Sequence, residues 1–132
     1  MRIRDATAAD WPSIWPFLRT IVAVGDDDAI VGTANMYANR PGPGAHVASA
    51  SFMVDPAHAG KGVGRALGAA VLDRARADGY RAMQFNAVVE TNDGAVRLWR
   101  SLGFSILTTV PEAFHHPTRG YVGLHVMFLP LT

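Results

Sequence analysis

Three glycines at alternate positions strongly limit what this chain can fold into. Gly60, Gly62 and Gly64 lie between an apolar run that ends at Val54 and a helical pattern that passes through Leu67. Glycine accepts backbone angles that other residues avoid, so the chain can turn sharply from a strand into a helix here. The first N–H groups of such a helix have no partner within it, and the helix dipole favours an anion beside them. The loop therefore predicts a site for a phosphate or pyrophosphate group.

Two known phosphate-binding motifs do not fit this loop. A P-loop requires Ser or Thr after its Gly-Lys pair, whereas Gly62 follows Gly60 and Lys61. A dinucleotide fingerprint counted from Gly60 requires glycine at the position of Arg65, and counted from Gly62 it requires glycine or alanine at the position of Leu67. A helix start with no ligand is the alternative, although each glycine near a helix start costs about 1 kcal/mol.

The apolar pattern alternates between the periods of strands and helices. Apolar side chains recur at helical spacing from Val63 to Ala75, before Gly79, and again between Asn92 and Gly103. A first helix is predicted to begin after Thr7 or Asp10. In the second half of the chain, the only long loop is predicted at 111–120. Strands are predicted at 2–5, 21–24, 29–37, 46–54, 81–89, 104–110 and 121–129. This order predicts a single α/β domain over residues 1–132.

Composition and charge exclude several classes of protein. The 132 residues are 49% hydrophobic and 17% charged, which is enough apolar material for one core and excludes intrinsic disorder. With zero Cys, disulfides and thiolate chemistry are excluded. The net charge is +1 and no stretch collects five or six like charges, so we expect no nucleic acid partner. We also expect no membrane association and a cytoplasmic location, because the chain shows neither a signal peptide nor a long apolar stretch.

Two sequence blocks resemble the GNAT superfamily of acetyl-CoA-dependent N-acetyltransferases. The family signature is Arg or Gln, two residues, Gly, one residue, and Gly or Ala, and the glycine loop matches it except that Ala59 replaces the Arg or Gln. The segment from Asn92 to Phe104 matches the family's Asn-x-x-Ala-x-x-Leu-Tyr and its closing Gly-Phe, with Trp99 in place of the Tyr. The resemblance implies a mixed, mostly antiparallel central sheet, flanked by helices and splayed where acetyl-CoA binds.

The same resemblance implies which residues bind the cosubstrate, acetyl-CoA. The pantetheine arm is expected between the strand that ends at Val54 and the strand at 81–89, and the phosphates are expected on the amides of the glycine loop. The implied set is Met53, Val54, Gly60, Lys61, Gly62, Val63, Gly64, Arg65, Asn92 and Trp99. No metal is expected, because adjacent histidines such as His115 and His116 rarely converge on one ion.

The reaction requires an unprotonated amine and a proton for the departing thiolate. Glu90 is the preferred base, directly or through water, and Asn86 lies on the same face of the strand at 81–89 if side chains alternate. The alternatives are a solvated charge at a strand end for Glu90 and a structural role for Asn86. Trp99 cannot act as a general acid, because its indole N–H keeps its proton near neutral pH, so solvent or the new ammonium would protonate the thiolate.

The acceptor is expected to be a small amine, for which an amino acid or an analogue is the best candidate. An α-amino group, with an ordinary pKa near 7.7 to 8.0, needs a weaker base than a lysine near 10.4. His115 and His116 are expected to bind this substrate, because the family often shapes its acceptor pocket in the loop before the last strand. The alternative is a non-catalytic module that binds or senses acyl-CoA, as Ala59 and Trp99 suggest. The resemblance also implies that the chain can form a homodimer.

The family usually places a second helix and a loop between its first helix and the strand at 21–24. From Leu18 to Val24 there is no Gly, Pro, Asn or Asp to end a helix and turn the chain. We therefore expect that segment to be missing near Thr20 to Val24, and part of the acceptor pocket with it.

Overall fold

The structure is a computed structural model that describes residues 2, 4, 7–10 and 19–132 of the chain. Its sheet has six strands in the order β1-β2-β3-β4-β6-β5, and only the pair of β3 and β4 is parallel. The strands are β1 Arg19–Val24, β2 Ile30–Ala38, β3 Val47–Val54, β4 Ala82–Val89, β5 Ser105–His116 and β6 Gly120–Pro130. The helices are α2 Val63–Ala77 and α3 Asp93–Ser101, with short 3-10 turns at Ala8–Asp10, Gly42–Gly44 and Pro56–His58. The predicted mixed, mostly antiparallel α/β fold is confirmed.

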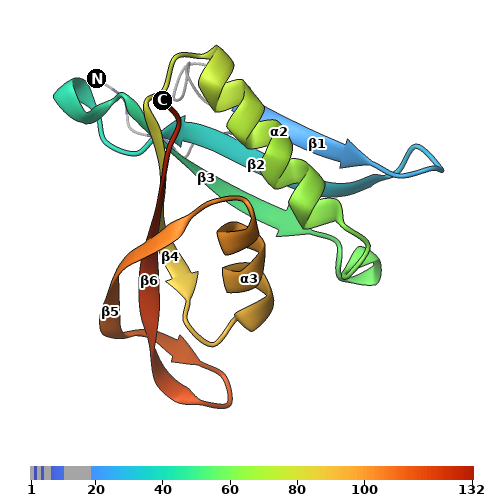
Figure 1. Cartoon of the computed structure of the whole chain (residues 1–132). Coiled ribbons are helices and arrows are strands. Elements are labelled where there is room, and N and C mark those ends of the chain that lie inside the picture. Colours follow the sequence, from blue (N-terminus) through green and yellow to red (C-terminus); the bar gives the residue numbers. More distant parts are fainter. Residues whose placement is uncertain (1, 3, 5–6, 11–18) are drawn as a thin grey trace.

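The sheet splits at its one parallel pair. β3 and β4 are paired only at Val47 with Ala82 and at Ala48 with Met83, and beyond these residues the two strands diverge. Figure 1 shows α2 lying across β1, β2 and β3, and α3 beside β4. The protein therefore consists of two half-sheets, each with its own helix, joined at one end and open at the other.

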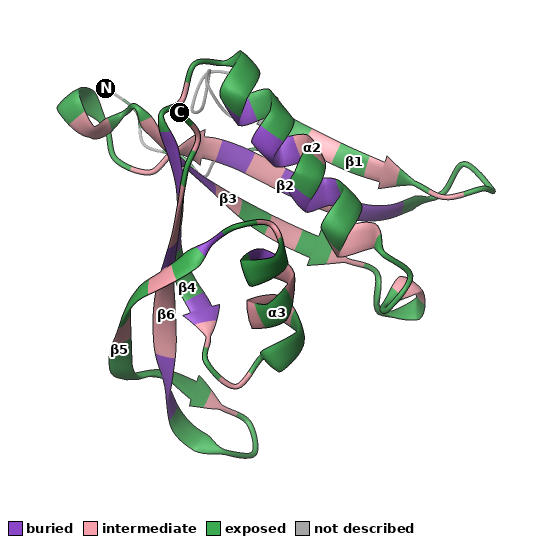
Figure 2. Ribbon diagram, viewed as in Figure 1, coloured by how far each residue is buried: buried purple, intermediate pink, exposed green. Residues whose placement is uncertain are grey.

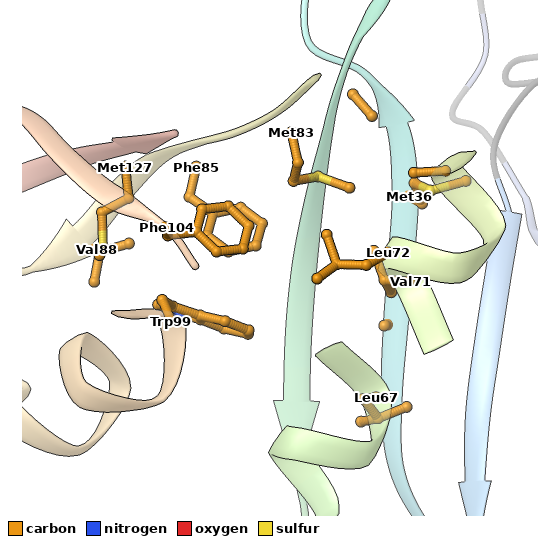
Figure 3. Packing of buried hydrophobic residues seen from close by; sticks show 13 residues of the cluster. Met36, Leu67, Val71, Leu72, Met83, Phe85, Val88, Trp99, Phe104 and Met127 are labelled. Atoms are coloured by element: carbon orange, nitrogen blue, oxygen red, sulfur yellow. The ribbon is translucent and has the colours of Figure 1, made fainter. Parts of the chain in front are cut away.

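Each half-sheet contributes its own part of the core. In one half, Leu67 and Val71 of α2 and Met36 of β2 are buried in the space between the helix and the sheet. In the other half, Phe85 lies 4.5 Å from the ring of Phe104 and 4.7 Å from that of Trp99, centroid to centroid. Figure 3 shows these two groups on either side of β3, and Figure 2 shows that the buried positions follow α2 and the central strands. Both groups belong to one continuous buried cluster, so the core connects the two half-sheets beneath the split.

The predicted ends of the helices and strands agree with the structure for most of the chain. Gly79, with φ of 85°, follows α2, Gly103, with φ of 105°, follows α3, and the side chain of Asn92 caps α3 by accepting from Ala95 N. The strand predicted at 2–5 and the first helix, expected after Thr7 or Asp10, fall largely outside the described residues. β1 begins at Arg19, directly after residues 11–18, which are not described.

The predicted loop at 111–120 is wrong. β5 continues to His116 and β6 begins at Gly120, so most of this segment forms the end of a hairpin. The pairing passes from Val110 opposite Leu124 to Phe114 opposite Val122, which leaves an irregular stretch on β5. An edge strand tolerates Pro111 and such a bulge because one of its sides has no strand partner. Proline therefore signals a strand irregularity here rather than the end of the strand.

Candidate active site

The glycine loop opens the first turn of α2 toward solvent. Gly60 and Gly62 have φ of 77° and 82°, and a Cβ atom added at either would meet nothing within 4 Å. Glycine is therefore required at both positions by the backbone angle and not by lack of space. Ala66 N donates to Gly62 O at 3.0 Å as the first bond of the helix. The amides of residues 63–65 precede it and have no partner within α2, as an anion site requires.

The two cations near this loop have different surroundings. Lys61 is exposed in the loop itself. Arg65 extends from α2 to α3, where its Nη2 donates to Ser101 Oγ at 2.6 Å, and Ser101 Oγ in turn donates to Leu98 O. Arg65 therefore joins the two helices that flank the split.

A cavity of about 490 Å³ occupies the split between β3 and β4. Val54, Gly64, Asn92 and Trp99, four of the residues predicted to bind the cosubstrate, line this cavity, as does Asn86. Met53 is 73% exposed and does not line it. The remaining lining residues are Tyr37, Ser49, Ala50, Ser51, Phe52, Phe85, Ala87, Val88, Val89, Ala95 and Leu98.

The cavity is bounded by side chains from both faces of the sheet. Phe52 of β3 points toward α3, since its ring lies 4.8 Å from that of Trp99. Its neighbour Ser51 points to the opposite face, where Ser51 Oγ lies 3.0 Å from Tyr37 Oη. One wall is therefore apolar and adjoins the helices, whereas the other carries hydroxyl groups. Sequence reasoning missed Tyr37, Ser49 and Ser51, although their alternation along two predicted strands was a usable signal.

The expectation that Asn86 and Glu90 share a face of β4 is wrong. Phe85 pairs with Met127 but Val88 pairs with His125, so β4 contains one residue more than β6 over this stretch. Such a bulge reverses the alternation after it, which leaves Asn86 and Glu90 on opposite faces. The sequence contains no local sign of this bulge, because it arises from the pairing of two distant strands.

Both polar side chains have partners inside the protein. Asn86 Nδ2 donates to Asn39 Oδ1 at 2.5 Å, and Asn86 Oδ1 accepts from Gln84 at 3.0 Å. Glu90 Oε1 accepts from Gly123 N at 2.7 Å, and Glu90 lines neither this cavity nor a second one nearby. Asn86 is therefore at the cavity wall, whereas Glu90 is held against β6.

The second cavity, of about 330 Å³, adjoins the first at Val89 and Asn92. Its other lining residues are Thr91, Phe114, His116 and Pro117. His116 Nδ1 accepts from the backbone N–H groups of Thr118 and Arg119 at 3.1 and 3.2 Å, so Nε2 carries the ring proton. His115 does not line this cavity, and its ring stacks on Tyr121 at 4.5 Å. The two predicted histidines therefore have different surroundings.

Among the described residues, no three His, Cys, Asp or Glu side chains form a group that could hold a metal ion. Within the same part of the chain, no helix is long and apolar enough to cross a bilayer.

The split mixed sheet, the glycine turn before α2 and the cavity in the split are the features that the resemblance to N-acetyltransferases implies. A family model described as the acetyltransferase (GNAT) family matches residues 3–104. The chain belongs to the GNAT family.

Known proteins similar to this chain carry related descriptions. It is 34% identical over 85 residues to the N-acetyltransferase aca1 of Schizosaccharomyces pombe. This match covers 64% of this chain and 41% of aca1. It is 39% identical over 62 residues to the L-methionine sulfoximine/L-methionine sulfone acetyltransferase of Salmonella typhimurium, covering 47% of this chain and 36% of that protein. The chain thus spans about two fifths of the length of these relatives.

Two solved structures extend the similarity over nearly the whole chain. A GCN5-related N-acetyltransferase from Kribbella flavida is 54% identical, with a TM-score of 0.84 over 96% of this chain and 95% of that one. The structure of yncA from Salmonella typhimurium with its cofactor acetyl-CoA is 28% identical, with a TM-score of 0.81 over 92% of this chain and 70% of that one.

Proposed function

We propose that this protein transfers the acetyl group of acetyl-CoA to a small amine. The observation that carries this proposal is the cavity in the split sheet, which has the first turn of α2 at one wall and hydroxyl and amide groups at the other. The two reactants could therefore approach each other from opposite faces of the sheet. A thioester bound in the split would lie between them.

The first turn of α2 suits the pyrophosphate of acetyl-CoA. The amides of Val63, Gly64 and Arg65 have no partner within the helix, and Gly60 and Gly62 present no side chain in front of them. Lys61 adds an exposed positive charge. The pantetheine arm would continue past Gly64 and Val54, with Asn92 and Trp99 on the side of α3. Met53, being outside the cavity, would contribute its backbone only.

The split also supports stabilisation of the tetrahedral intermediate. The amine nitrogen attacks the thioester carbonyl, and negative charge develops on its oxygen. Because β3 has no strand partner on the side of β4 beyond Ala48, backbone N–H groups there are available to such an oxyanion. One fixed donor of this kind is worth about 2.7 to 4 kcal/mol in the transition state.

Glu90 and Asn86 are proposed to act on the amine. Glu90 would take the proton of the amine through water, since its carboxylate is fixed at Gly123 and lines neither cavity. Asn86 is at the wall of the larger cavity, and its amide is oriented by Gln84 and Asn39. It would position the acceptor rather than exchange a proton, because an amide has no proton to give near neutral pH.

An amino acid or an analogue of one is the proposed acceptor. The smaller cavity adjoins the larger one and offers the apolar surfaces of Phe114 and Pro117 together with the Nε2–H of His116. It would take the side chain of the acceptor with His116 as the polar contact, since His115 does not line this cavity. The Salmonella typhimurium relative is described as acting on methionine sulfoximine and methionine sulfone, which have this size and polarity.

A non-catalytic acyl-CoA-binding module is the second candidate. Trp99 favours it, since this indole occupies the position of the family's tyrosine, is only 7% exposed and packs against Phe52, Phe85 and Phe104. Trp99 cannot supply a proton to the thiolate. Such a module would bind acetyl-CoA without releasing the thiol.

Two measurements separate the two functions. One is the release of free CoA thiol when a panel of amines is offered as acceptors, and the other is the thermal stabilisation of the protein by acetyl-CoA. We expect acetyl-CoA to raise the melting temperature and amino acids to release thiol faster than a lysine side chain in a peptide. Stabilisation without thiol release would support the binding module. Absence of stabilisation would contradict both proposals.

A further inference from the structure

Tyr37 is the one titratable side chain among the described residues that line the larger cavity. The other lining side chains are apolar, hydroxyl or amide groups, and the indole of Trp99. Glu90 and the described histidines lie outside this cavity. Hydroxyl and amide groups of this wall can only relay a proton near neutral pH, so the net proton donor among its side chains must be Tyr37.

The phenol of Tyr37 is fixed by a second hydroxyl of the same wall. Tyr37 Oη and Ser51 Oγ lie 3.0 Å apart across β2 and β3, and either oxygen can be the donor. Ser51 is on the stretch of β3 that diverges from β4, where the cavity opens. The pair therefore places two hydrogen-bonded hydroxyl groups, which can pass a proton between them, on the wall of the cavity in the split.

We propose that Tyr37 supplies the proton that the departing thiolate of CoA receives, with Ser51 passing it on. This inference rests on the proposed acetyl transfer. It also explains how Trp99 can occupy the family's tyrosine position: the proton source would be on β2 instead of α3.

The step balances without a further reactant. The step starts from the neutral amine, after Glu90 has taken the extra proton of the ammonium form. The amine nitrogen forms a bond to the acetyl carbon, the carbon–sulfur bond breaks, and its electron pair stays on sulfur. Ser51 gives its proton to sulfur and takes the proton of Tyr37. The tyrosinate then regains a proton through water from the acylated nitrogen, which becomes the neutral amide. One proton thus moves from nitrogen to sulfur.

The test compares Tyr37→Phe with Tyr80→Phe, which also loses a phenol hydroxyl but lines neither cavity. For both variants and the parent, kcat and the two KM values are measured from pH 6 to 10 with one amino acid as acceptor. General acid catalysis usually contributes about 10² to 10⁴ in rate. Because a thiolate is a good leaving group, we expect an effect below this range. In Tyr37→Phe at neutral pH, kcat should fall about 30-fold while both KM values stay within about threefold.

Two further results belong to the same experiment. The dependence of kcat on pH in Tyr37→Phe should differ in shape from that of the parent, because the variant has lost the proposed proton donor. Adding Ser51→Ala to Tyr37→Phe should change kcat by less than about twofold, because both residues serve one path.

Each other outcome overturns the inference. An unchanged kcat in Tyr37→Phe would overturn it and leave the acetyltransferase proposal intact. A raised KM for the amine with unchanged kcat would also overturn it, because Tyr37 would then only bind the acceptor. An equal loss in Tyr80→Phe would show that the effect is one of folding. A parent that binds acetyl-CoA but releases no thiol would overturn the proposed function and this inference together.

Discussion

The two sides of the larger cavity are built in different ways. At the first turn of α2 the proposed phosphate site consists of backbone amides, which remain whatever side chains surround them. At the opposite wall the chemistry depends on single side chains, Tyr37, Ser51 and Asn86, from three different strands. A backbone site tolerates replacements such as Ala59 for the family's Arg or Gln. A side-chain site does not, so substitutions should affect the two sides differently.

The largest effect is expected from Gly62→Val. At φ of 82° a β-branched residue strains the backbone, and its side chain would stand in front of the amides of α2. We expect acetyl-CoA affinity to fall at least about 100-fold, as measured by calorimetric titration, and stability to fall by about 1 to 2 kcal/mol.

Gly79→Val is the matched control for this change. Gly79 has φ of 85°, has the same open space and lies just beyond the other end of α2. It should lower stability by a similar amount while leaving acetyl-CoA affinity unchanged. Equal losses of affinity in the two variants would show that the glycine turn only starts the helix.

A smaller effect is expected from Glu90→Gln on the acceptor side. The amide oxygen of Gln can still accept from Gly123 N, but the side chain can no longer take a proton. We expect kcat to fall about 30-fold with little change in melting temperature. Glu90→Ala, which also loses the bond to Gly123, should be less stable by about 1 kcal/mol. An unchanged kcat in Glu90→Gln would reduce Glu90 to a link between β4 and β6.

Trp99→Phe should keep turnover within about tenfold, or roughly 1.4 kcal/mol of transition-state energy. Trp99 packs between three phenylalanine rings and against α2, where a Cβ added at Gly68 would lie 3.0 Å from its ring. The main loss should therefore be in stability, measured by urea unfolding. Trp99→Tyr should not raise kcat. A hundredfold fall in Trp99→Phe with unchanged acetyl-CoA affinity would give Trp99 a direct part in the reaction.

The smallest effect is expected from Lys61→Ala. Lys61 is exposed, and the backbone amides hold most of the charge of the proposed phosphate group. Acetyl-CoA affinity should fall by less than about threefold, and the difference should shrink further at high salt. A loss of tenfold or more would show that side-chain charge, not the backbone, dominates this side.

The difference between the two sides also explains what could be predicted from the sequence. The glycine loop and the cap of α3 by Asn92 depend on residues within a few positions of each other, so local spacing was sufficient. The bulge between Phe85 and Val88 and the pairing of Tyr37 with Ser51 depend on strands distant in the chain. For the same reason the sequence predicts a loop at Pro111, because nothing in the local sequence indicates that this residue lies on an edge strand.

The central claim is that acetyl passes from CoA to an amine within the split sheet. The most direct measurement incubates the protein with acetyl-CoA and methionine sulfone and quantifies both free CoA and the N-acetylated product by mass spectrometry. The account predicts that the two products appear in equal amounts. At limiting acetyl-CoA, Gly62→Val should abolish their formation, whereas Gly79→Val should not. Free CoA without acetylated amine, or neither product despite thermal stabilisation by acetyl-CoA, would contradict it.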